Sequence, residues 1–160
     1  QGKITVTDFL LGQYYLYEDA LNSQEWNIES DSMKVVLGHE CQKAICSFRG
    51  RKWTAWFALD VPVSDGPLKF CGLPGLIMEV YDRGKQYYFC INGMQQVSAT
   101  PITFGILDKD FKHFQKTDRK DFLLSKYRYL RNQNSINEAS TGISLGSVDE
   151  ALKYDLIERE

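Results

Sequence analysis

The sequence predicts a mainly β (α+β) fold, in which a curved antiparallel sheet or half-barrel is followed by one or two C-terminal helices. Short stretches of alternating apolar and polar residues, separated by turn residues, fill the first two thirds of the chain. Beyond residue 117 the apolar residues take a helical spacing instead. We therefore expect an antiparallel β domain over residues 1–116 and a helical appendage over residues 117–160, with a polar linker at 132–146.

The expected strands follow one another closely. They cover residues 3–6, 13–17, 26–28, 33–37, 40–48, 52–59, 76–81, 86–91 and 97–104. Residues 48–52 and 82–85 are expected hairpin connections, and Gly84 is free to take a positive φ in the second one. In the strand at 52–59, Trp53 and Trp56 point to opposite faces, which indicates a strand that is covered on both sides or lines a cleft.

Two helices are expected in the last third of the chain. The first covers residues 118–132, and its apolar face carries Phe122, Leu123, Tyr127 and Leu130. The second begins at a capping box, residues 147–150, and its apolar positions are Val148, Leu152 and Leu156.

Composition excludes several classes of protein. The 19 Lys and Arg residues nearly balance the 21 Asp and Glu residues and are interspersed with them, so we expect no nucleic-acid partner. No apolar stretch approaches 18 residues, so we expect no membrane span. The chain begins Gln1-Gly2 without a leader, which suggests a mature or trimmed product and says nothing against secretion.

Residues with catalytic or metal-binding chemistry are sparse. His39 and Cys41 lie two apart and share a strand face, which makes them weak metal ligand candidates, but two ligands do not form a site. Residues 142–146 match G-x-S-x-G around Ser144, but a polar segment stands where that motif needs a strand. We therefore expect no catalytic residues, no cofactor and a protein that is not an enzyme.

Four cysteines lie in the first 90 residues without a C-x-x-C spacing. Their number allows two disulfides in an oxidising compartment, and buried free thiols are an equally good interpretation.

The stretch GPLKFCGLPGLIME, residues 66–79, places conformationally restricted prolines and flexible glycines directly before an expected apolar strand. Pro74 followed by Gly75 suits a type II turn with Gly75 at positive φ, while Leu68 and Phe70 point inward and Lys69 stays solvated. Together with nearby tryptophans the stretch is a candidate binding cleft for an apolar or planar ligand. The candidate residues are Trp53, Trp56, Pro67, Gly72, Leu73, Pro74, Gly75 and Leu76. The alternative interpretation is that they form the core of the sheet edge.

Several blocks of the sequence resemble one family. Residues 72–77 read GLPGLI, and they follow GHECQKA at 38–44, FRGR at 48–51 and WTAWF at 53–57. This pattern resembles the GLPGLI family of Bacteroidetes, also called the Porph_ging family, from about residue 4 to about residue 130. Leu68 and Cys71 depart from it, since the family often has Trp at the first position and a small residue at the second.

The resemblance implies a secreted or envelope-associated bacterial protein of unestablished activity, whose relatives usually carry further strands ahead of the point where this chain begins. The implied compartment leads us to expect at least one disulfide. The block around Cys41 also resembles extracytoplasmic half-barrel domains of the lipoprotein-carrier type, which bears on shape and not on function. We therefore expect a non-enzymatic extracytoplasmic domain that binds a small apolar ligand or an envelope partner protein at the sheet and loop cleft. The alternative is a metal-binding envelope protein using His39 and Cys41.

Overall fold

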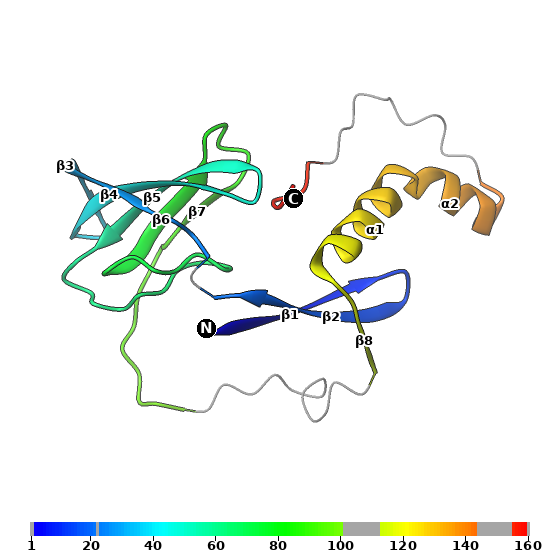
Figure 1. Ribbon diagram of the computed structural model, residues 1–160, viewed down its shortest axis with the longest axis horizontal. Helices are drawn as coiled ribbons and strands as arrows, with labels where there is room; N and C mark the ends of the chain where they lie inside the picture. The colour runs from blue at the N-terminus through cyan, green and yellow to red at the C-terminus, as the bar shows by residue number, and fades with distance from the viewer. Residues whose placement is uncertain (1, 22, 101–112, 144–154, 160) are drawn as a thin grey trace. The chain divides into compact units, whose positions relative to one another are not determined.

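The computed structural model describes residues 2–21, 23–100, 113–143 and 155–159, and these form eight strands and two helices (Figure 1). The mainly β class with two C-terminal helices is confirmed, but the strands form two open sheets instead of one. The chain divides into two compact units. The sheet unit comprises Gln1–Ile4 and Asp19–His113, and the hairpin–helix unit comprises Thr5–Glu18 and Phe114–Glu160.

The sheet unit is built on five antiparallel strands in sequential order. They are β3 (Asn27–Val36), β4 (His39–Phe48), β5 (Arg51–Ala58), β6 (Leu76–Asp82) and β7 (Tyr88–Cys90). The two strands expected at 26–28 and 33–37 are one strand, β3, whose register against β4 shifts between Glu29 and Met33. Extra residues at such an irregularity interrupt the alternation of burial, so the sequence pattern looks like a break.

Tight turns join the hairpins. Leu37-Gly38 has φ of 48° and 82°, and Arg49-Gly50 has φ of 50° and 72°. Positive φ at both central residues matches the right-handed strand twist, and glycine makes one of the two positions free of strain. In the turn after β6 the expectation for Gly84 was wrong, because Lys85 takes the positive φ there, at 51°.

One face of the five-stranded sheet forms the main core of this unit. Trp53, Ala55 and Phe57 of β5 are all buried on this face, as the alternation predicted. Phe70 and Leu73, from the connection between β5 and β6, are buried as well. Phe70, Cys71 and Leu73 of that connection therefore belong to the core, whereas Leu59, Val63 and Leu68 earlier in it are exposed.

The hairpin–helix unit has its own small core. Its strands are β1 (Lys3–Leu10), β2 (Gln13–Ala20) and β8 (Phe114–Lys116), in the order β1-β2-β8, with β8 parallel to β2. Its helices are α1 (Arg119–Arg131) and α2 (Gln133–Thr141). Leu10, Tyr17 and Phe122 form the buried centre. The carboxylate of Asp118 accepts a hydrogen bond from the Lys120 N–H at 2.8 Å and so caps α1.

Several expectations for the second half of the chain need correction. The polar linker expected at 132–146 is helical over Gln133–Thr141, because no glycine or proline interrupts it before Gly142, which ends α2 with a φ of 71°. Residues 97–100 form no strand, and the rest of the strand expected at 97–104 lies outside the described residues. So do Ser144, Val148 and Leu152. The strand β8 was missed because three residues carry too little alternation.

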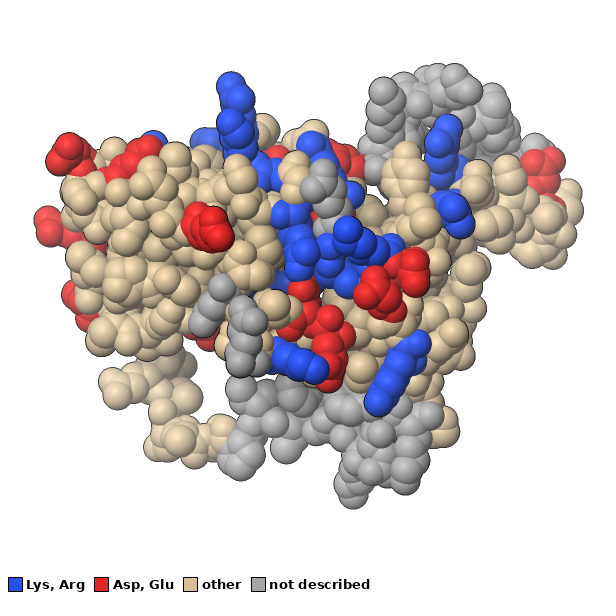
Figure 2. All heavy atoms as spheres, in the orientation of Figure 1, with Lys and Arg blue, Asp and Glu red and all other residues tan. Residues whose placement is uncertain are grey.

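Charged side chains of both signs neighbour one another on the face drawn in Figure 2. Within the sheet unit, Arg51 and Asp82 form a buried ion pair of 2.9 Å, and Lys43 pairs with Glu29 at 2.8 Å. Neither described helix has the length and apolarity needed to cross a membrane.

Candidate functional site

Trp53, the first expected site residue, belongs to the core. Its side chain is 2% exposed, its ring centroid lies 4.6 Å from that of Phe70, and its indole N–H donates a hydrogen bond of 3.1 Å to the Phe48 carbonyl. The ring and its polar atom are therefore both fully engaged inside the protein.

Trp56 lies on the opposite face of the sheet. Its indole N–H donates to the Tyr81 hydroxyl at 3.5 Å, and the Lys34 ammonium lies 4.9 Å from its ring centroid. Lys34 also pairs with Glu79, so the cation is held in place over the ring. The two tryptophans are therefore separated by the sheet and do not form one aromatic site.

The hexapeptide at 72–77 is explained by packing. A Cβ on Gly75 would lie 2.0 Å from the Ala58 carbonyl oxygen, so only glycine allows this close approach of two backbones. The expected positive φ at Gly75 was wrong, and Gly72 has it instead, at 90°. Leu73 is 2% exposed and fills the core, whereas Pro74 is exposed. The motif therefore fixes the entry into β6.

The residues before the hexapeptide are held by polar contacts. Lys69 was expected to be solvated, but its ammonium lies 2.9 Å from a carboxylate oxygen of buried Asp19, which also binds Arg49 at 2.5 Å. The Trp26 indole N–H donates to the Cys71 carbonyl at 2.8 Å. Leu68 was expected to point inward and is exposed, because its φ of 56° turns the chain at this residue.

The contacts of Asp19 determine its ionisation. Burial by itself raises the pKa of this carboxyl, but the hydrogen bond and charge of Lys69, the Ala20 N–H and the charge of Arg49 outweigh it. The pKa is therefore held below its ordinary value, and the carboxylate stays charged at neutral pH.

A groove of about 500 Å³ lies between residues 65–67, in the connection from β5 to β6, and the strands β6 and β7. We call it the loop groove, and its lining residues are Asp65, Gly66, Pro67, Leu76, Ile77, Met78, Tyr88, Phe89, Cys90 and Ile91. Pro67 and Leu76 were expected site residues. Sequence reasoning missed the wall formed by β7, because the residues after the hairpin gave no signal beyond their alternation. A groove of this size with mostly apolar walls suits a small ligand or a partner side chain.

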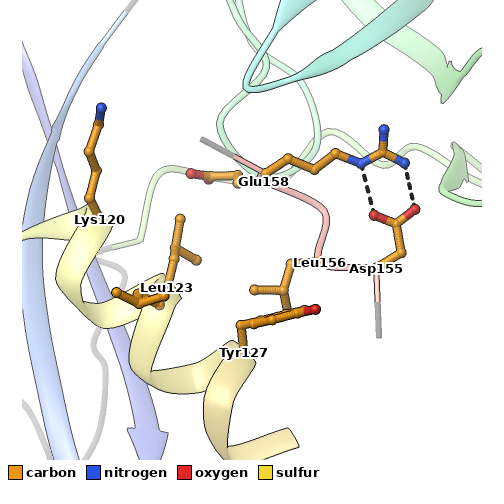
Figure 3. A pocket seen from close by; sticks show the side chains of 8 residues that line it. Lys120, Leu123, Tyr127, Asp155, Leu156 and Glu158 are labelled. Carbon is orange, nitrogen blue, oxygen red and sulfur yellow. Dashed lines mark hydrogen bonds and ion pairs between the residues drawn. The ribbon is translucent and has the colours of Figure 1, made fainter. Parts of the chain in front are cut away.

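A smaller hollow of about 380 Å³ lies on α1 (Figure 3). Leu123 and Tyr127 from the helix and Leu156 from the C-terminal segment supply its apolar lining, and Asp155 and Arg159 form a two-point ion pair, with atoms 2.6 and 2.8 Å apart, at its edge. The buried pair of Arg119 and Glu158, 2.9 Å apart, ties the same segment to the helix. The Arg119–Glu158 pair thus joins the segment to the helix, whereas the Asp155–Arg159 pair lies within the segment.

The weak metal candidates do not gain support. The Nδ1 atom of His39 lies 2.7 Å from a carboxylate oxygen of Asp60, while Cys41 is fully buried and burial raises the pKa of its thiol. A raised pKa opposes the thiolate that a metal requires. Among the described residues, no three His, Cys, Asp or Glu side chains gather at one place.

The expected disulfide is also wrong, since all four cysteines are free. Cys41, Cys46 and Cys71 are buried at separate positions and Cys90 is exposed. Burial raises the pKa of Cys46 to about 12, so this thiol stays protonated. The interpretation as buried thiols on strands holds for Cys41 and Cys46, which lie on opposite faces of β4.

The chain is thus a mainly β protein with the loop groove and a smaller hollow on its surface. The residues of its hexapeptide, 72–77, pack in the sheet unit and fix the entry into β6. A family model described as "Protein of unknown function (Porph_ging)" matches residues 27–79, from β3 into β6 and across the hexapeptide. The match supports membership of the family that the sequence resembles, on the evidence of this part of the chain. No curated protein matches it.

Two solved structures are similar to this chain. They are PNGF-II in space group P21, with a TM-score of 0.48, and PNGF-II in space group C2, with a TM-score of 0.46. Both are 17% identical to this chain, of which the matches cover 76% and 78%. The matches cover 22% and 23% of the PNGF-II chains, so this chain spans less than a quarter of their length.

Proposed function

We propose that this protein is a non-enzymatic extracytoplasmic binding domain, and that the loop groove takes a small apolar ligand or an apolar side chain of an envelope partner protein. The single observation that carries the proposal is the loop groove itself, a concave surface of about 500 Å³ whose walls include Pro67, Leu76, Phe89 and Ile91. The assigned residues differ from those expected from sequence, since Trp53 and Leu73 are core.

The rigidity of one wall supports the proposal. The Leu76 N–H donates to the Val61 carbonyl at 3.0 Å, and the Ile77 N–H donates to the Asp65 carbonyl at 2.9 Å. These bonds fasten the start of the connection to β6, and the close approach of Gly66 to Ile77 leaves no space for a side chain there. A groove that is already formed loses little conformational entropy when a ligand binds.

The extracytoplasmic location rests on the family resemblance alone. The free cysteines remove the disulfide as a supporting argument. Fractionation of cells that make the full-length protein tests the location: we expect the protein in the envelope or the medium, and recovery in the cytoplasm contradicts this part of the proposal.

Titration with the fluorescent apolar probe 1-anilinonaphthalene-8-sulfonate tests the groove. We expect saturable binding to the folded wild type and a loss of about tenfold or more in affinity for Ile91→Glu, because a carboxylate would be buried in the apolar groove. Val97→Glu is the matched control, since Val97 is exposed and does not line the groove. Equal binding by both variants, with unchanged thermal midpoints, would refute the proposal.

A further inference from the structure

A second groove, of about 490 Å³, lies elsewhere on the sheet unit and shares no residue with the loop groove. Its lining includes Asn27, Ile45, Thr54 and Tyr81, which stand opposite one another in register on β3, β4, β5 and β6. We call it the strand groove. Because directly paired residues point to the same face of a sheet, these four side chains form one row across four strands.

Basic side chains lie one step along the same face. Ser47 pairs with Lys52, and the Arg83 N–H donates to the Lys52 carbonyl at 2.9 Å, so these three residues continue the face beyond the row. All three line the strand groove. Two residues along a strand span about 6.6 Å. The backbones of Lys52 and Arg83 therefore lie about that distance from those of Thr54 and Tyr81.

These two cations differ from the other basic residues around them. Lys34, Lys43, Arg49 and Arg51 each pair with a carboxylate within the sheet unit. The described residues supply no such ion pair to Lys52 or Arg83, and both residues are exposed. Two adjacent cations at the end of a groove provide a favourable place for an anionic group.

The remainder of the groove is suited to a hydroxylated ring. Ile45 and the Tyr81 ring supply apolar surface, and the Tyr81 ring is fixed by Tyr88, whose centroid lies 5.9 Å away, and by the Lys85 ammonium at 5.1 Å. Asn27, Thr54 and Ser47 supply an amide and two hydroxyls, which both donate and accept hydrogen bonds. Glu25 adds a carboxylate that accepts them.

From this arrangement we propose that the strand groove binds an acidic sugar. The ring packs against Ile45 and Tyr81, its hydroxyls bond to Asn27 and Thr54, and its carboxylate lies against the cations of Lys52 and Arg83. The ligand is either a free hexuronic acid or a residue of an acidic polysaccharide, since both present the same ring and carboxylate. No bond is formed or broken in this binding.

Chemical-shift titration of the full chain with three probes tests the proposal. D-Galacturonate and D-galactose differ at the carboxylate, and trigalacturonate presents the same ring within a chain. We expect saturable shifts at the Asn27, Thr54 and Tyr81 amides with D-galacturonate and binding about tenfold weaker with D-galactose. Tighter binding of trigalacturonate than of the monomer identifies a polysaccharide as the source, whereas equal binding identifies the free sugar.

Substitutions separate this site from general charge attraction. The double variant Lys52→Gln, Arg83→Gln should reduce D-galacturonate binding to the level of D-galactose and leave the thermal midpoint unchanged, since only exposed side chains change. Lys116→Gln is the control, because Lys116 is an exposed lysine of β8 that does not line the groove. Equal binding of D-galacturonate and D-galactose, an equal loss in the control variant, or no saturable shift with any probe would each overturn the proposal.

Discussion

Replacing Gly75 with alanine should destabilise the sheet unit more than its single methyl group suggests. The added Cβ would meet the Ala58 carbonyl oxygen at 2.0 Å and the Ala58 carbonyl carbon at 2.7 Å. Ordinary contact starts at 3.4 Å, so the two backbones have to separate by about 1.4 Å. Neither neighbour is the end of a flexible side chain that can move aside.

Such a separation would break backbone hydrogen bonds around the end of β5. The Val61 N–H donates to the Ala58 carbonyl at 3.4 Å and the Leu76 N–H donates to the Val61 carbonyl at 3.0 Å. Loss of two backbone hydrogen bonds costs about 2 kcal/mol, and overpacking adds about 1 kcal/mol or more. We therefore expect Gly75→Ala to lower the free energy of unfolding by about 3 kcal/mol.

Urea unfolding followed by tryptophan fluorescence measures this change. The protein has three tryptophans, Trp26, Trp53 and Trp56, and all belong to the sheet unit, so the signal reports on that unit. Gly93→Ala is the matched control, because a Cβ there meets nothing within 4 Å and φ lies outside the positive range. This control should change stability by less than about 1 kcal/mol. A Gly75→Ala variant as stable as Gly93→Ala would refute the packing explanation of the hexapeptide.

Three further predictions concern the polar and thiol groups of the sheet unit. Asp82→Ala should cost about 3–5 kcal/mol in urea unfolding, because the buried guanidinium of Arg51 loses its carboxylate partner, while the neutral side-chain oxygen of Gln86 stays at 3.0 Å; a cost below about 1 kcal/mol contradicts this. The pKa of Asp19 is lowered on folding, so its stabilising contribution is complete above the unfolded pKa of about 3.9 and is lost as pH falls through the lower folded value. Thermal midpoints measured below pH 4 should therefore fall more steeply for wild type than for Asp19→Asn, and parallel curves argue against this role. Iodoacetamide should label exposed Cys90 in the folded protein and leave the buried thiols unlabelled, whereas unfolding without reductant should make all four reactive; intact mass decides, and fewer than four labels after unfolding would indicate a disulfide.

The strands were largely predictable because the alternation of buried and less buried residues survives along β5. Trp53, Ala55 and Phe57 have the burial that their spacing predicts. The connection before β6 was predictable as a turn, but not in its detail. The backbone takes a positive φ at Leu68 and Gly72, and this changes which neighbouring side chains point inward. Residue propensities do not predict a positive φ at a leucine.

The site was less predictable than the fold. Sequence proximity joined Trp53 and Trp56, although strand alternation places them on opposite faces. The walls of both grooves combine residues from different strands. The alternation within one strand does not reveal which residues of the next strand it faces, such as Ile45 opposite Thr54 and Thr54 opposite Tyr81. Register between strands depends on turn geometry and packing, so cross-strand rows become visible only in the structure.

The most direct test of the central claim, that the loop groove and not the tryptophan core is the binding surface, is a chemical-shift titration with 1-anilinonaphthalene-8-sulfonate. We expect saturable shifts at the amides of Leu76, Phe89 and Ile91, and an unchanged indole N–H signal from Trp53, which donates a hydrogen bond to the Phe48 carbonyl. A shift of the Trp53 indole signal without shifts in the loop groove would contradict this claim.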